Sequence, residues 1–192
     1  TCDRPKFVYA STAFRGLEVF LKIWPEIKKR IPEATLDCYT KTTLYLDDNP
    51  QEINYQWLYQ HIETLPGVEI KEPLPQKEFF KVLPNYYAML YPNTFEETVC
   101  GAALESMASG VPIITSERAG LIGVVKSGNG GVLIPGDPHS DEYAEKFVDA
   151  TVSLWNAKGA RSTMSKEGFK KIRENYDIKQ TAKQCQSLLD RL

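Results

Sequence analysis

The sequence contains few of the residues that build metal sites or disulfide frameworks. Its 192 residues include two histidines and four cysteines, and no Asp-x-Asp pair. The cysteines are too widely scattered for a zinc site or a disulfide framework, at Cys2, Cys38, Cys100 and Cys185. Cys38 lies in an apolar segment and Cys185 on the apolar face of a predicted helix. We therefore expect buried free thiols in a reducing compartment, the cytoplasm, and no metal cofactor.

The sequence also lacks a strong net charge and a long apolar run. A formal net charge of −2 gives no support to a nucleic-acid partner. No apolar stretch approaches the length needed to cross a membrane, and no signal peptide is visible at Thr1. With 42% hydrophobic residues, the chain can bury a sizeable core. We expect one domain over residues 1–192 with no transmembrane segment.

Six short apolar runs alternate with helical patterns, which is typical of an α/β fold with a mainly parallel sheet. The predicted strands are 6–11, 35–39, 67–71, 87–91, 111–115 and 132–134. The default arrangement is a doubly wound, Rossmann-like sheet in the order 3-2-1-4-5-6, with strand four central. Ligands bind such sheets where the loops after strands one and four meet, so residues 11–16 and 93–101 should converge.

The predicted helices follow the apolar spacing. They cover residues 17–30, with a kink or restart at Pro25, then 53–65, 76–83, 101–109, 119–127, a helix capped by Ser140, 162–176 and a last helix from Asp177. Residues 47–50 read as a turn rather than as a metal site. The last helix should face the core with Ala182, Cys185, Leu189 and Leu192.

The most informative stretch is residues 91–116, where two glutamates are separated by seven residues. Glu97 precedes a helix of small residues, and Glu105 lies inside it. A glutamate among small apolar neighbours needs a partner, because a poorly solvated charge is costly. The helix N-terminus near Gly101 offers free N–H groups to a phosphate, and Gly101 carries no side chain to block them.

This stretch resembles the donor-binding, C-terminal half of GT-B glycosyltransferases, especially the family 4 group. The resemblance rests on the Glu-x7-Glu motif of Glu97 and Glu105, followed by the small-residue helix and the run Ala-Ser-Gly-Val-Pro at 108–112. It implies transfer of a hexosyl or deoxyhexosyl group from a nucleotide diphosphate sugar, without a metal or other cofactor. It also implies an acceptor-binding domain or chain as a partner.

The resemblance assigns roles to the motif. Glu105 would accept hydrogen bonds from the two ribose hydroxyls. Glu97 would bind hydroxyls of the transferred sugar, and Glu96 is the alternative if the loop register differs. Backbone N–H groups would assist Glu97, at Thr98, Val99, Cys100 and Gly101. Cys100 reads as a small residue at a helix start rather than as a nucleophile, since no histidine is near in sequence.

Arg15 lies directly before Gly16, where the family places a basic residue that binds the donor diphosphate. It would neutralise the leaving group, so Arg15 and Glu97 are the predicted catalytic residues. Many family members have a second basic residue six positions earlier, but here that residue is Tyr9. Hydroxyls of Ser11 and Thr12 could contribute instead.

The nucleobase site and the alternatives remain open at this stage. The resemblance places the base at the end of the third strand, near Glu72 and Leu74. A nucleotide-sugar epimerase of the same fold is the alternative enzyme, and a non-catalytic nucleotide-sugar-binding module is the alternative outside enzymes.

Overall fold

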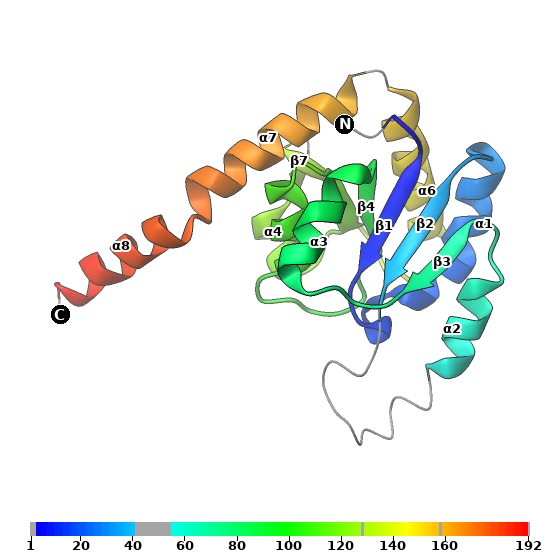
Figure 1. Ribbon diagram of the computed structural model, residues 1–192, viewed down its shortest axis with the longest axis horizontal. Coiled ribbons are helices and arrows are strands. Elements are labelled where there is room, and N and C mark those ends of the chain that lie inside the picture. The colour runs from blue at the N-terminus through cyan, green and yellow to red at the C-terminus, as the bar shows by residue number, and fades with distance from the viewer. Residues whose placement is uncertain (1–2, 41–54, 128, 158, 192) are drawn as a thin grey trace.

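The computed structural model describes residues 3–40, 55–127, 129–157 and 159–191, and this part of the chain forms one parallel sheet flanked by helices (Figure 1). Its seven strands lie in the order β3-β2-β1-β4-β5-β7-β6 and pair in parallel throughout. The strands are β1 Lys6–Ala10, β2 Thr35–Tyr39, β3 Val68–Lys71, β4 Ala88–Tyr91, β5 Ile113–Ser116, β6 Lys126–Ser127 and β7 Gly130–Ile134.

The predicted six-strand order is confirmed, with β4 between β1 and β5 and β7 as the predicted sixth strand. The difference is β6, a two-residue edge strand paired with β7. The predicted helix over 119–127 was too long, because α5 covers only Gly120–Val124 and the chain is extended again at Lys126. A strand of two residues is too short to show a period in the sequence.

The other predicted helices within the described residues are present with shifted ends. They are α1 Phe20–Arg30, α2 Gln56–Glu63, α3 Gln76–Val82, α4 Gly101–Ala108, α6 Asp141–Asn156, α7 Ala160–Asn175 and α8 Ile178–Leu189. The 3₁₀ turns η1 Ala13–Arg15 and η2 Leu17–Val19 precede α1, which continues through Pro25. Ser140 caps α6 as predicted, since its hydroxyl accepts a hydrogen bond from Tyr143 N at 3.1 Å. The predicted turn at 47–50 and the first two residues of the predicted helix 53–65 lie outside the described residues.

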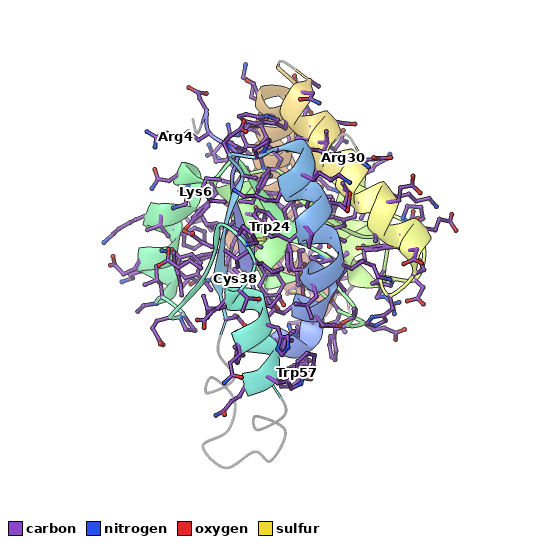
Figure 2. All side chains as sticks on the ribbon, turned by 90° about the vertical axis from the view of Figure 1, so that its right-hand side faces the viewer. Arg4, Lys6, Trp24, Arg30, Cys38 and Trp57 are labelled. Atoms are coloured by element: carbon purple, nitrogen blue, oxygen red, sulfur yellow. The ribbon has the colours of Figure 1, made fainter. Side chains whose placement is uncertain are left out.

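The core lies on both faces of the sheet. Helices α1, α2 and α6 cover one face, and α3, α4 and α7 cover the other (Figures 1 and 2). Figure 2 views the side of α1, where the labelled Trp24 lies among the side chains next to the sheet. Trp24 is fully buried, donates its indole N–H to Pro66 O at 2.9 Å and meets Phe7 edge to face at 6.4 Å.

The last helix does not pack as predicted. Figure 1 shows α8 leaving the body of the molecule beyond α7. Its predicted core residues Ala182 and Cys185 are exposed, and Leu189 has 64% of its surface exposed; Leu192 lies outside the described residues. The free thiol of Cys185 is therefore not buried, whereas the free thiols of Cys38 and Cys100 are. Among the described helices, none has the length and apolar character needed to cross a bilayer.

Candidate functional site

The loops after β1 and β4 meet, as the topology predicted. Gly16 has a φ of +111°, and a Cβ added there would lie 2.0 Å from the carbonyl oxygen of Pro92. Only a glycine allows the two backbones to approach this closely. Gly16 therefore joins the loop that carries Arg15 to the loop that carries Glu97.

Arg15 and Glu97 form a direct ion pair in this junction. Arg15 Nη1 donates to Glu97 Oε1 at 3.0 Å. The hydroxyl of Tyr91 donates to the same oxygen at 2.8 Å, and Ser11 Oγ lies 3.4 Å from that hydroxyl. Glu97 is 8% exposed, so its carboxylate is held by two donors in a largely dehydrated position.

The guanidinium of Arg15 is also held by aromatic rings. Its central carbon lies 5.4 Å from the centre of the Phe14 ring and 4.8 Å from that of Phe95. The two rings meet edge to face at 5.9 Å. These contacts fix the guanidinium beside the pocket described next, and cation–π attraction adds to the ion pair.

A pocket of about 380 Å³ opens at the carboxyl ends of β1 and β2, next to the start of α4. This is the place where open α/β sheets bind ligands. Its walls are formed by Ala10, Ser11, Thr12, Arg15, Tyr39, Thr40, Pro73, Leu74, Phe79, Glu97, Val99, Gly101, Ala102 and Glu105.

Eight of the twelve predicted site residues line this pocket, and four do not. Those in the wall are Ser11, Thr12, Arg15, Leu74, Glu97, Val99, Gly101 and Glu105. The four outside it are Gly16, Glu72, Thr98 and Cys100. Gly16 supports the site because it allows the loops after β1 and β4 to contact each other, and the backbone of Thr98 contacts Gly120.

Six of the fourteen pocket residues were not among the predicted site residues, namely Tyr39, Thr40, Phe79, Ala10, Pro73 and Ala102. The first two follow from the topology, because the carboxyl end of β2 lies beside that of β1. Tyr39 packs edge to face on Phe79 at 5.2 Å and lies 3.0 Å, oxygen to oxygen, from the hydroxyl of Tyr86. Tyr86 in turn donates to the buried carboxylate of Asp37 at 2.6 Å. The aromatic end of the pocket is thus a fixed wall.

Three buried polar atoms of the pocket residues have no hydrogen-bond partner in the described chain. They are Thr12 Oγ1, Thr40 Oγ1 and Arg15 Nε. Thr40 is 1% exposed and Thr12 6% exposed. Two further buried atoms without a partner in the described chain, Tyr59 Oη and Thr115 Oγ1, belong to residues outside the pocket wall.

Glu105 has a partner, as predicted, but the contact is exposed to solvent and Glu105 is only partly buried. The side-chain amide of Gln76, the first residue of α3, donates to Glu105 Oε1 at 2.6 Å. The bond joins α3 to α4, and an ionised carboxylate with one donor still has room for two hydroxyl groups. Gln76 was not predicted, because the helix start gives no sign of a contact with α4.

Cys100 and Tyr9 have structural roles. Burial raises the pKa of the Cys100 thiol to about 11, from an ordinary value near 9, so the thiol is protonated at neutral pH and is no nucleophile. Tyr9 is fully buried and donates its hydroxyl to Thr12 O at 2.7 Å. It therefore fixes the loop after β1 and does not line the pocket. Within the described residues, no cluster of three or more His, Cys, Asp or Glu side chains could bind a metal ion.

Residues 4–156 match the protein family described as glycosyl transferases group 1. The chain belongs to this family. The match covers the strands and loops that form the pocket, including both glutamates of the motif.

Two curated relatives are longer than this chain. Spore coat protein SA of Bacillus subtilis is 24% identical over 191 residues, which are 96% of this chain and 48% of that protein. D-inositol 3-phosphate glycosyltransferase of Paenarthrobacter aurescens is 24% identical over 152 residues, which are 79% of this chain and 35% of that protein. The chain spans about half the length, or less, of these relatives.

A solved structure shows the same fold. The Anabaena protein Alr3699/HepE, solved in complex with UDP-glucose, superposes with a TM-score of 0.76 at 13% identity, over 98% of this chain and 49% of that one. The chain thus has the Rossmann-like fold of a GT-B C-terminal domain.

Proposed function

We propose that this chain is the donor domain of a glycosyltransferase and binds a nucleotide diphosphate sugar, with UDP-glucose as the first candidate. The observation that carries the proposal is the pocket itself. At the carboxyl ends of β1 and β2 it combines a cation, two carboxylates and the start of a helix. The family supports the reaction, and the UDP-glucose held by the Anabaena protein motivates the choice of nucleotide.

The diphosphate would lie between Arg15 and the start of α4. Arg15 uses Nη1 for Glu97, which leaves Nη2 for phosphate oxygens. A Cβ added at Gly101 would meet nothing within 4 Å, so a phosphate can approach the first N–H groups of α4. These groups would neutralise the charge that develops on the leaving diphosphate, without a metal or other cofactor.

The rest of the donor would extend to both sides of the phosphates. The ribose hydroxyls would bind Glu105, and the base would lie against Tyr39, Phe79 and Leu74. Hydroxyls of the transferred sugar would bind Glu97, through the carboxylate oxygen that Arg15 and Tyr91 leave open. Backbone N–H groups of Thr98 to Gly101 would assist, as the family resemblance implies.

Calorimetric titration with UDP-glucose, UDP and uridine tests this assignment. Glu105→Ala should weaken all three by roughly ten- to a hundredfold, because a charged hydrogen bond is worth about 1.5–3 kcal/mol. Glu145→Ala, in the exposed part of α6, is the control. Unchanged affinity in a folded Glu105→Ala variant would mean that this carboxylate only holds Gln76.

Sugar transfer requires an acceptor held next to the donor. Since the curated relatives are at least twice as long, we assign acceptor binding to a further domain or a separate chain. Membership of the family 4 group, a hexosyl or deoxyhexosyl donor and a cytoplasmic location belong to the same proposal. Turnover of donor and acceptor by the longer protein would support it, whereas epimerisation of UDP-glucose would favour the alternative enzyme. Tight binding with neither reaction would favour a non-catalytic module.

A further inference from the structure

The loop that carries Glu97 is held by a second loop, which follows β5. We name residues 93–100 the Glu97 loop and residues Ala119 and Gly120 the β5 turn. The backbone N–H of Gly120 donates to the carbonyl oxygen of Glu97 at 2.7 Å. A Cβ at position 120 would lie 2.1 Å from Thr98 O and 2.7 Å from Glu97 O. No side chain fits between these backbones, so the contact requires glycine.

The β5 turn also adopts an unfavourable conformation. Ala119 has φ +43° and ψ −131°, and it is the one non-glycine residue with positive φ in the described part of the chain. Such strain persists only where the surrounding structure imposes it, and it is concentrated at functional sites. Here the strained residue directly precedes the glycine that contacts Glu97.

A further contact ties the Glu97 loop to the end of β5. Ser116 Oγ donates to Asn93 O at 2.6 Å, and both residues are fully buried or nearly so. The loop is thus attached at its first residue through Ser116 and at Glu97 through Gly120. Meanwhile the side chain of Glu97 is held by Arg15 and Tyr91.

We propose that the β5 turn positions Glu97, by fixing the backbone from which its carboxylate reaches Arg15 and the pocket. Ala119 and Gly120 do not line the pocket, so they act through Glu97 and are positioning residues. For the ligand this inference rests on the proposed function, because Glu97 is the group assigned to the transferred sugar. Displacing the turn should therefore affect sugar recognition more than recognition of the nucleotide.

Gly120→Ala tests the proposal, with Gly123→Ala as the matched control. Gly123 lies three residues later in α5, and a Cβ added there meets nothing within 4 Å. In Gly120→Ala we expect the preference for UDP-glucose over UDP to fall at least fivefold, while the affinity for UDP changes less than twofold. Gly123→Ala should alter neither. An unchanged preference in Gly120→Ala would overturn the proposal.

A second measurement needs no ligand. Urea unfolding of Arg15→Ala, Glu97→Ala and the double variant gives a double-mutant cycle, and the cycle yields the coupling energy between the two side chains. This coupling should be lost in the Gly120→Ala background and kept in the Gly123→Ala background. If the coupling persists in Gly120→Ala, the turn does not position Glu97. If UDP and UDP-glucose do not bind the unaltered chain, the proposed function fails, and the cycle still decides the role of the turn.

The pair Ala119→Gly and Ala119→Val replaces Gly120→Ala if the latter does not fold. Glycine adopts this positive-φ conformation readily, so Ala119→Gly should keep the turn in place and leave the coupling of Arg15 with Glu97 unchanged. Ala119→Val is therefore the variant to compare, because a β-branched residue is strongly disfavoured at positive φ and should displace the exposed turn, which lowers the coupling. An unchanged coupling in Ala119→Val would count against the proposal.

Discussion

The Arg15–Glu97 ion pair gives the sharpest test of the site, through the variant Glu97→Gln. The substitution keeps the shape of the side chain and removes its charge. The carboxylate is 8% exposed and accepts two hydrogen bonds, from Arg15 and Tyr91. Hydrogen bonds to a charged group contribute about 1.5–3 kcal/mol, and breaking a fully buried pair costs about 3–5 kcal/mol.

The Arg15 side chain is 24% exposed, which lowers the cost because water can reach part of it. The amide oxygen of the glutamine can also keep the bond from Tyr91. We therefore expect Glu97→Gln to lower the free energy of unfolding by about 2 kcal/mol. For a domain of this size that is a drop of about 4–8 °C in melting temperature, measured by calorimetry.

Glu96→Gln is the matched control, because it makes the same chemical change one residue earlier. The Glu96 side chain is 82% exposed, and its ion pair with Arg118 is 4.0 Å long. Such surface pairs contribute about 0–1 kcal/mol, so the melting temperature should change little. Equal shifts in the two variants would refute the reasoning, since burial and the contact with Arg15 would then make no difference. The affinities of the same two variants for UDP-glucose decide between Glu97 and Glu96 as the sugar ligand.

The same variant, Glu97→Gln, should lose stability but should not lose affinity for UDP. In Glu97→Gln the guanidinium loses its carboxylate and becomes more available to phosphate, so the affinity for UDP should hold or rise, most clearly at low salt. The advantage of UDP-glucose over UDP should be lost. In Arg15→Ala, UDP should weaken far more than uridine. If Arg15→Ala weakened UDP and uridine equally, the assignment of Arg15 to the diphosphate would be wrong.

Three other predictions concern protonation and the contact between α3 and α4. Burial raises the pKa of the Cys100 thiol to about 11 and raises the pKa of the Tyr91 hydroxyl from its ordinary value near 10. The folded state therefore binds these two protons more tightly than the unfolded state does. The free energy of unfolding, measured by urea unfolding at each pH, should be constant below about pH 8.5 and should fall as the pH rises toward 11. At pH 8, iodoacetamide and mass spectrometry should find the exposed Cys185 modified quickly and Cys100 only on unfolding. Gln76→Glu would place a carboxylate where an amide now donates to Glu105 at 2.6 Å, so two like charges would meet. The affinity for UDP should therefore fall at pH 8 and recover toward pH 5, where a carboxylate of the pair gains a proton. The control Gln76→Ala should show no such recovery.

The order of the strands and the convergence of the two loops could be predicted because both follow from local patterns and general rules. Apolar runs separated by amphipathic helices imply right-handed crossovers, and these determine which loops lie side by side. That argument needs no knowledge of side-chain contacts. It located Arg15 and Glu97 at the same edge of the sheet, and the structure places them 3.0 Å apart.

The contact itself could not be predicted, because it depends on how closely the backbones approach. The family resemblance implied that Arg15 binds the diphosphate and Glu97 binds the sugar, with no contact between the two side chains. Their hydrogen bond results from Gly16 against Pro92, a contact between segments 76 residues apart that a period in the sequence does not record. The same holds for Tyr39 and Phe79, which read as an ordinary strand end and an ordinary helix residue. They become a pocket wall only when β2 and α3 are placed beside β1 and α4.

The prediction for α8 was wrong for a related reason. Apolar residues recur on one face of this helix. Such a pattern indicates that the face is buried, but it does not identify the surface that buries it. In α6 the apolar face does meet the core, since Phe147 and Val148 are buried. In α8 the same pattern lies beyond the body of the molecule, with Ile178 77% exposed and Leu188 62% exposed. The helical period therefore determines which residues of α8 share a face. Whether that face reaches the sheet depends on the direction of the preceding helix, and α7 leads the chain away from the sheet.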